Sequence, residues 1–122
     1  MIGIRRGEIY LANLGNIKDN DIGKIRPVLV FQNDFLNKMI QDSKYQDVVI
    51  IPLSSQIRND DFSLFIKKRD NLEKDSIIAC NTIKMIHSKR LLLDRGILTK
   101  LTNDEILSIE NILYNLFGCN NR

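Results

Sequence analysis

Hydrophobic and polar residues alternate through much of the chain, which is the pattern of β-strands that turn one side towards a core. The alternation predicts strands over residues 7–14 and 62–66 and a long strand over 76–86. Short apolar runs predict buried strands over 27–31 and 48–53, and a last strand is predicted over 91–98, interrupted at 94–96. Pro27 is expected at the first position of its strand, because proline has no N–H to donate to a neighbouring strand. Pro52 and the Ser54–Ser55 pair are expected to end the strand over 48–53.

Two segments have the helical period instead. Residues 34–40 predict a short helix, and the segment after Thr102 predicts a longer one. Thr102 and Glu105 have the spacing of a capping box, flanked by Leu101 and Ile106 as a hydrophobic staple. Gly118 suits the C-terminal cap. The apolar face of this helix is expected to contain Ile106, Ile109, Leu113, Leu116 and Phe117.

Several short strands followed by one amphipathic helix predict a mainly β protein: a small, strongly curved barrel with the helix laid against it. A chain of 122 residues forms one domain, here residues 1–122. No apolar run approaches the roughly 20 residues needed to span a bilayer, and the N-terminal residues lack the pattern of a signal peptide. Cys80 and Cys119 are far apart and are expected to be free thiols, so we expect a cytoplasmic protein without contact to a membrane.

The net charge is +3, which favours a nucleic-acid partner only weakly. Basic residues gather in an early stretch with Lys18, Lys24 and Arg26, and in a triplet at residues 67–69. Charge alone leaves open that these are ordinary solvated loop and strand ends.

Several catalytic classes are excluded by composition. One histidine and two distant cysteines cannot supply the three or four ligands of a zinc centre. The chain has no Gly-rich phosphate loop and no G-x-S-x-G frame. A ribonuclease mechanism with two histidines on one chain is impossible, because His87 stands alone. We therefore expect neither a metal nor another cofactor.

A family resemblance runs in register from about residue 4 to 118. It is carried, in chain order, by residues 6–10 (R-G-E-I-Y), 23–30 (G-K-I-R-P-V-L-V) with N-D at 33–34, 52–55 (P-L-S-S), 75–78 (D-S-I-I) with 83–86 (I-K-M-I), and the helix over 101–116. Together these segments resemble the MazF/PemK toxins of type II toxin–antitoxin systems. The resemblance implies an SH3-like barrel with a C-terminal helix, a homodimer, and metal-independent, sequence-selective cleavage of single-stranded RNA through attack by the ribose 2′-hydroxyl.

The resemblance also implies the catalytic residues. The family's arginine matches Arg26 and its threonine matches Ser54. A guanidinium can stabilise the negative charge that builds on a phosphate during cleavage, and a hydroxyl can donate a hydrogen bond to a phosphate oxygen. Asp21 matches an acidic family position and is a candidate base or positioning group. On local grounds alone, Arg26 could be a surface residue paired with Asp21, and Ser54 could simply end a strand.

The groove residues implied to contact RNA are Lys18, Lys24, Ser55, Gln56, Asn81, Thr82 and Lys84. The resemblance further implies a cognate acidic antitoxin that competes for the same groove. Asn81 and Thr82 stand where the family commonly has an acid and glutamine, and His87 stands where aspartate is usual. These departures leave open which RNA sequence is recognised, and whether the chain cuts efficiently.

Two other functions remain open from the sequence. A toxin on this same fold can poison DNA gyrase by protein contact, as the CcdB family does, and would use the surface of the C-terminal helix. A module that binds nucleic acid without cutting it is the second alternative.

Overall fold

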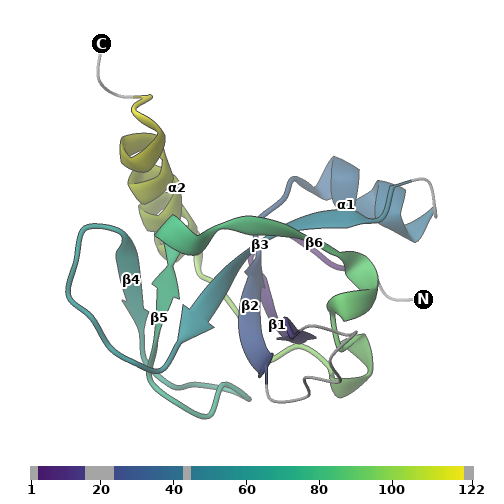
Figure 1. The fold of residues 1–122 in the computed structure, drawn as a ribbon, viewed down its shortest axis with the longest axis horizontal. Coiled ribbons are helices and arrows are strands. Elements are labelled where there is room, and N and C mark those ends of the chain that lie inside the picture. Colours follow the sequence, from purple (N-terminus) through teal and green to yellow (C-terminus); the bar gives the residue numbers. More distant parts are fainter. Residues whose placement is uncertain (1–2, 16–23, 43–44, 120–122) are drawn as a thin grey trace.

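The computed structural model describes residues 3–15, 24–42 and 45–119. Within these residues, seven strands and two α-helices form one mainly β unit (Figure 1). The strands are β1 (Glu8–Asn13), β2 (Ile25–Val30), β3 (Asp47–Ser54), β4 (Ser63–Ile66), β5 (Ser76–Ala79), β6 (Lys84–His87) and β7 (Thr99–Lys100). The helices are α1 (Asp34–Gln41) and α2 (Asn103–Phe117). No helix within the described residues is long and apolar enough to cross a membrane.

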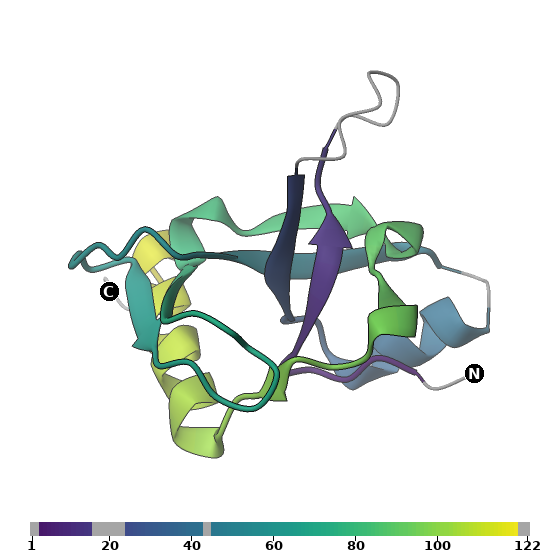
Figure 2. The same ribbon diagram turned by 90° about the horizontal axis from the view of Figure 1, so that it is seen from below.

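All of the strand pairs are antiparallel and belong to one curled sheet. The strand order is β4-β5-β3-β2-β1-β7, and β6 pairs separately with β3. The sheet curls into a half-barrel, and α1 and α2 lie at its opposite ends (Figures 1 and 2). This arrangement confirms the expected small curved β-barrel with a C-terminal helix.

Successive side chains of a strand point to opposite sides of the sheet. In the central strands both sides are buried, each in its own core. One core lies towards α2 and contains Ile9, Leu29, Ile51, Leu53, Ile109 and Leu113, among others. The other lies towards α1 and contains Tyr10, Val28, Val30, Val48, Ile50 and Ile40, among others. Residues of β1, β2 and β3 therefore alternate between the two cores.

Two prolines occupy strand interiors, contrary to expectation. β2 begins at Ile25, so Pro27 is its third residue; Pro27 precedes the pairing with β3, which starts at Val28. β3 likewise continues through Pro52 to Ser54. Neither β5 nor β6 pairs with β3 at Pro52. On that side, no partner strand requires the N–H that proline lacks.

The long strand expected over residues 76–86 is wrong. A 3₁₀ turn at Cys80–Thr82 divides it into β5 and β6. Both strands pair with β3, but β6 pairs with Asp47–Ile50 and β5 with its last two residues. The turn takes up the offset between these two registers, and its geometry is reinforced by the Thr82 hydroxyl, which donates to the Ala79 carbonyl at 2.8 Å.

The last strand expected over residues 91–98 does not form. Leu91 makes one isolated bridge to Ala12, and a 3₁₀ turn follows at Leu93–Arg95. Gly96 then has a φ of 76°, a left-handed conformation that glycine adopts without steric penalty. Regular pairing with β1 resumes only at β7.

Both helices form where the periodicity places them. The Asn33 side chain caps α1 by accepting the N–H of Leu36 at 2.9 Å. The capping box of α2 is present, with Thr102 and Glu105 bonded reciprocally, and Gly118 closes the helix in the left-handed conformation. Phe117 is an exception to the expected apolar face: its side chain is 62% exposed.

Candidate functional site

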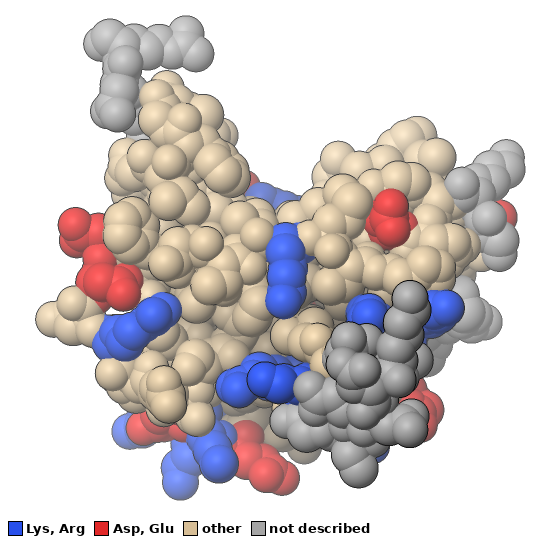
Figure 3. All heavy atoms as spheres, viewed as in Figure 1, with Lys and Arg blue, Asp and Glu red and all other residues tan. Residues whose placement is uncertain are grey.

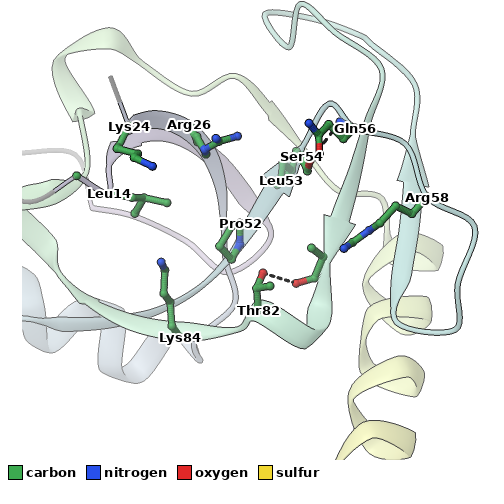
Figure 4. A pocket seen from close by; sticks show the side chains of 12 residues that line it. Leu14, Lys24, Arg26, Pro52, Leu53, Ser54, Gln56, Arg58, Thr82 and Lys84 are labelled. Atoms are coloured by element: carbon green, nitrogen blue, oxygen red, sulfur yellow. Dashed lines mark hydrogen bonds between the residues drawn. The ribbon is translucent and has the colours of Figure 1, made fainter. Parts of the chain in front are cut away.

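An open hollow of about 550 Å³ lies where the ends of β2 and β3 meet the turn between β5 and β6. Its lining consists of Leu14, Gly15, Lys24, Arg26, Pro52, Leu53, Ser54, Gln56, Arg58, Ala79, Thr82 and Lys84. These residues come from four separate parts of the chain, so only the folded sheet brings them together (Figure 4).

Arg26 and Ser54 lie on neighbouring strands. The antiparallel register of β2 and β3 sets Val28 opposite Pro52. When this register is continued by two residues, Arg26 comes opposite Ser54. Both side chains therefore leave the sheet on the same face. Figure 4 shows Arg26 pointing towards Ser54.

The Ser54 hydroxyl makes one hydrogen bond to the backbone of the following loop. Its oxygen accepts the backbone N–H of Gln56 at 3.1 Å. A hydroxyl can accept two hydrogen bonds and donate one. Within the described residues the Ser54 O–H has no acceptor, so it can donate to a ligand in the hollow.

Four cationic side chains of the described residues line the hollow: Lys24, Arg26, Arg58 and Lys84. No carboxylate is among its described lining residues. Lysine and arginine side chains gather around the hollowed middle of this face (Figure 3). The ammonium groups of Lys24 and Lys84 point towards its centre, and the Arg58 guanidinium enters from the other side (Figure 4). Such a concentration of one sign of charge attracts an anionic ligand.

Arg58 was missed by the sequence reasoning. It lies in the loop after β3, and its Nε is 3.6 Å from the Asp60 carboxylate. The N–H of Phe62 donates to the same carboxylate at 2.9 Å, and this bond, aided by Arg58, lowers the pKa of Asp60. The turn thus holds the negatively charged Asp60 carboxylate next to the Nε atom of Arg58. A single arginine in an aperiodic loop gives no sequence signal of where it points.

The structure gathers most, but not all, of the groove residues singled out from the sequence. Lys24, Arg26, Ser54, Gln56, Thr82 and Lys84 line the hollow. Ser55 faces a neighbouring hollow that also includes Arg26. Asn81 is exposed on the 3₁₀ turn and lines neither hollow. Lys18 and Asp21 lie outside the described residues, so their roles stay predictions.

His87 and Cys80, two side chains with other chemistry, are not among the residues that line the hollow. No three His, Cys, Asp or Glu side chains of the described residues form a group that could hold a metal ion. His87 ends β6 on the exposed surface, where its Nδ1 accepts the N–H of Lys89 at 3.1 Å. Burial raises the pKa of the Cys80 thiol to about 11, which makes it a poor nucleophile near neutral pH. The hollow is instead equipped to bind an anion and donate hydrogen bonds to it.

Comparison with known proteins points to one family. Residues 5–117 match the family model described as PemK-like, MazF-like toxin of type II toxin-antitoxin system. The chain is 33% identical over 122 residues to a protein of Staphylococcus epidermidis named endoribonuclease MazF, covering 97% of this chain and 94% of that protein.

Solved structures resemble the whole fold. A MazE–MazF structure from Deinococcus radiodurans has a TM-score of 0.70 at 16% identity, covering 97% of this chain and 98% of that chain. An endoribonuclease in complex with its cognate antitoxin, from a mycobacterial species, has a TM-score of 0.69 at 20% identity, covering 94% and 95%. At these identities the two structures establish the shared fold.

Proposed function

The chain belongs to the family of PemK-like, MazF-like toxins of type II toxin–antitoxin systems and is an endoribonuclease of that family, and we propose that it cuts single-stranded RNA at the hollow around Arg26 and Ser54. The observation that carries this proposal is the placement of the guanidinium and the hydroxyl on one face of adjoining strands, inside a cationic hollow. A phosphodiester bound there meets both donors at once.

The proposed reaction is an internal transesterification. The ribose 2′-oxygen attacks the adjacent phosphorus, the bond from phosphorus to the 5′-oxygen breaks, and the products end in a 2′,3′-cyclic phosphate and a 5′-hydroxyl. Negative charge builds on the non-bridging oxygens during attack. The two-pronged Arg26 guanidinium stabilises that charge, and Pro27 restrains the backbone of Arg26 to an extended form.

Ser54 and an acid complete the proposal. The Ser54 O–H donates to a phosphate oxygen or orients the attacking 2′-hydroxyl, while its oxygen stays bonded to Gln56. A guanidinium has hydrogen-bond donors and no acceptor, so Arg26 cannot take up the 2′-proton. Asp21 is the proposed base or positioning group.

The test is cleavage of a long single-stranded RNA with excess EDTA present. We expect undiminished cutting, because the reaction needs donors and charge that the side chains supply. Loss of activity with chelator, restored by magnesium or zinc, would contradict the proposal. A gyrase supercoiling assay run alongside tests the rival function: inhibition of gyrase without RNA cleavage would favour the rival.

We also propose that the active protein is a homodimer. Leu107, Tyr114 and Phe117 are 61%, 52% and 62% exposed, and their spacing places them along one stripe of α2. Monomeric proteins rarely leave a contiguous apolar surface uncovered, and a two-fold pair joins two short grooves into one longer channel. Light scattering at micromolar concentration should give about twice the 14.1 kDa chain mass. A 14.1 kDa species that cuts RNA would contradict this.

The proposed inhibitor is a cognate acidic antitoxin. The cations of the hollow, which would hold RNA phosphates, suit an acidic segment equally well. The likeness to a solved endoribonuclease–antitoxin complex supports such a partner.

A further inference from the structure

A second hollow, of about 400 Å³, lies beside the first residues of β2, next to the hollow already described. Arg26 and Leu53 line both hollows, so the two share a wall. Ile25 and Pro27, whose side chains point to the sheet face opposite that of Arg26, line only the second. An RNA strand that places a phosphate at Arg26 therefore has room for a nucleotide on each side of the guanidinium.

The second hollow combines an apolar floor with a polar rim. The floor includes Leu11, Pro27, Leu53, Leu72 and Leu98, and the rim includes Ser55, Glu73 and Lys74. Its volume falls within the roughly 300–1,000 Å³ of small-molecule sites, where apolar walls take the ligand body and a few polar groups fix its orientation. A flat nucleobase meets this description, with its ring face on the leucines and its edge at the rim.

Glu73 is the one carboxylate among the described residues that line either hollow. Its side chain is exposed, and within the described part of the chain it has no hydrogen bond or ion pair. In a cationic groove, this carboxylate does nothing to hold phosphate. It can accept hydrogen bonds from a base.

The loop that carries Glu73 is held firmly. Arg69 and Leu72 exchange backbone hydrogen bonds of 3.2 and 2.9 Å, and the N–H of Asn71 donates to Leu98 at 2.9 Å. The Arg69 guanidinium is also bonded to Glu105 in the first turn of α2. These bonds fix the backbone just before Glu73, so its carboxylate stays within one side-chain length of the rim of the second hollow.

We propose that the second hollow is a base-selecting subsite: it takes the nucleobase next to the cleaved phosphodiester, and Glu73 favours bases with an exocyclic amine over uracil. Adenine, cytosine and guanine each offer an exocyclic amine N–H to an acceptor. The one ring donor of uracil, its N3–H, lies between two carbonyl oxygens, which a carboxylate repels. Arg26 would position the backbone while Glu73 supplies sequence preference. The inference rests on the proposed RNA cleavage at Arg26.

The test compares cut sites in a pool of single-stranded RNA of random sequence. Wild-type protein should cut with uracil depleted at one of the two positions that flank the broken bond. Glu73→Gln should raise the use of uracil at that position by about fivefold or more, since one good base contact discriminates on this scale. Asp94→Asn is the matched control, because Asp94 is an exposed carboxylate that lines neither hollow. It should leave the cut-site profile unchanged.

An unchanged uracil preference in Glu73→Gln would overturn the subsite, as would a wild-type profile without uracil depletion beside the cut. A second measurement does not need cleavage: backbone amide NMR signals of residues 71–74 during titration with cytidine or uridine 5′-monophosphate. Cytidine monophosphate should shift them at lower concentration. If that holds in a protein that cuts no RNA, the cleavage proposal fails, and the second hollow remains a site that prefers cytosine to uracil but selects no cut position. If the protein cuts RNA but neither nucleotide shifts these signals, the subsite fails.

Discussion

At the scale of single residues, Arg26 and Ser54 would act on one phosphate with unequal strength. Because Arg26 stabilises charge that appears only in the transition state, Arg26→Ala should slow cleavage by about 10²–10³-fold with little loss of RNA affinity. Arg26→Lys should restore little, since an ammonium lacks the planar fork. Ser54→Ala should cost about 10–100-fold, the loss of one hydrogen bond to a charged group, and Ser54→Thr should stay active. Single-turnover cleavage and binding of a non-cleavable RNA separate the two effects.

Arg58→Ala provides the contrast within the same hollow. Arg58 is a further phosphate contact, so its loss should weaken RNA binding, reduce the slope of log affinity against log salt by about 0.7, and leave the rate of bound RNA nearly unchanged. Circular dichroism must first show that every variant is folded. An Arg26→Ala protein that is folded and cuts at the wild-type rate would refute the catalytic assignment.

The sequence predicted those site residues that belong to recognisable motifs on paired strands. Lys24, Arg26 and Ser54 belong to short motifs beside strands, and the pairing of β2 with β3 then brings them into one hollow. Arg58 could not be found in this way, because its direction depends on the turn that Asp60 and Phe62 form. The second hollow was also hidden, since the loop around residue 73 reaches it only through the curl of the sheet.

At the scale of elements, local signals predicted the limits of the helices better than those of the strands. The capping box and Gly118 place α2 correctly because they act within a few residues of each other. The division between β5 and β6 was missed because both strands pair with β3, at registers that the sequence of residues 76–86 does not encode. Likewise, residues 91–98 are apolar enough at both ends to suggest a strand, but within this segment only Leu91 forms a bridge, an isolated one to Ala12.

The first turn of α2 is tied to the loop before β5 by an ion pair. The Arg69 guanidinium donates to both Glu105 carboxylate oxygens, at 2.7 and 2.8 Å, and to the Lys100 carbonyl at 2.6 Å. These bonds, with the neighbouring charge, outweigh burial and lower the pKa of Glu105 while raising that of Arg69. The pair therefore connects helix, loop and β7 at one point.

This ion pair predicts a pH dependence of stability. With its pKa lower in the folded than in the unfolded state, Glu105 stabilises the fold fully above its unfolded pKa of about 4.3, and this contribution is lost as pH falls through the folded value. Glu105→Gln can keep the capping box but loses the charge. At pH 7 it should lower the free energy of unfolding by about 1 kcal/mol, allowing for partial exposure. In urea denaturation the gap should shrink towards pH 3; a gap that is the same at both pH values would contradict this.

At the scale of the whole molecule, the same curled strands form the two cores and, at their ends, the proposed binding site. The middle strands bury both faces in separate cores, and where their ends leave these cores the side chains become available for ligands. Arg26, Ser54 and Lys84 lie at this boundary, held by a rigid interior but open to solvent. A site on such strand ends is preorganised, as electrostatic stabilisation of a transition state requires.

RNA and the acidic antitoxin are both anionic, and we propose that both bind the cations of the first hollow. If antitoxin and RNA both occupy the hollow, the acidic antitoxin segment should displace a fluorescent non-cleavable RNA completely, and both affinities should fall as salt rises. Lys84→Ala should weaken both partners in parallel, whereas Lys100→Ala, which removes an exposed lysine that lines neither hollow, should weaken neither. Fluorescence anisotropy measures the competition. A complex that holds RNA and antitoxin together, without loss of affinity for either, would show that the two partners bind different surfaces.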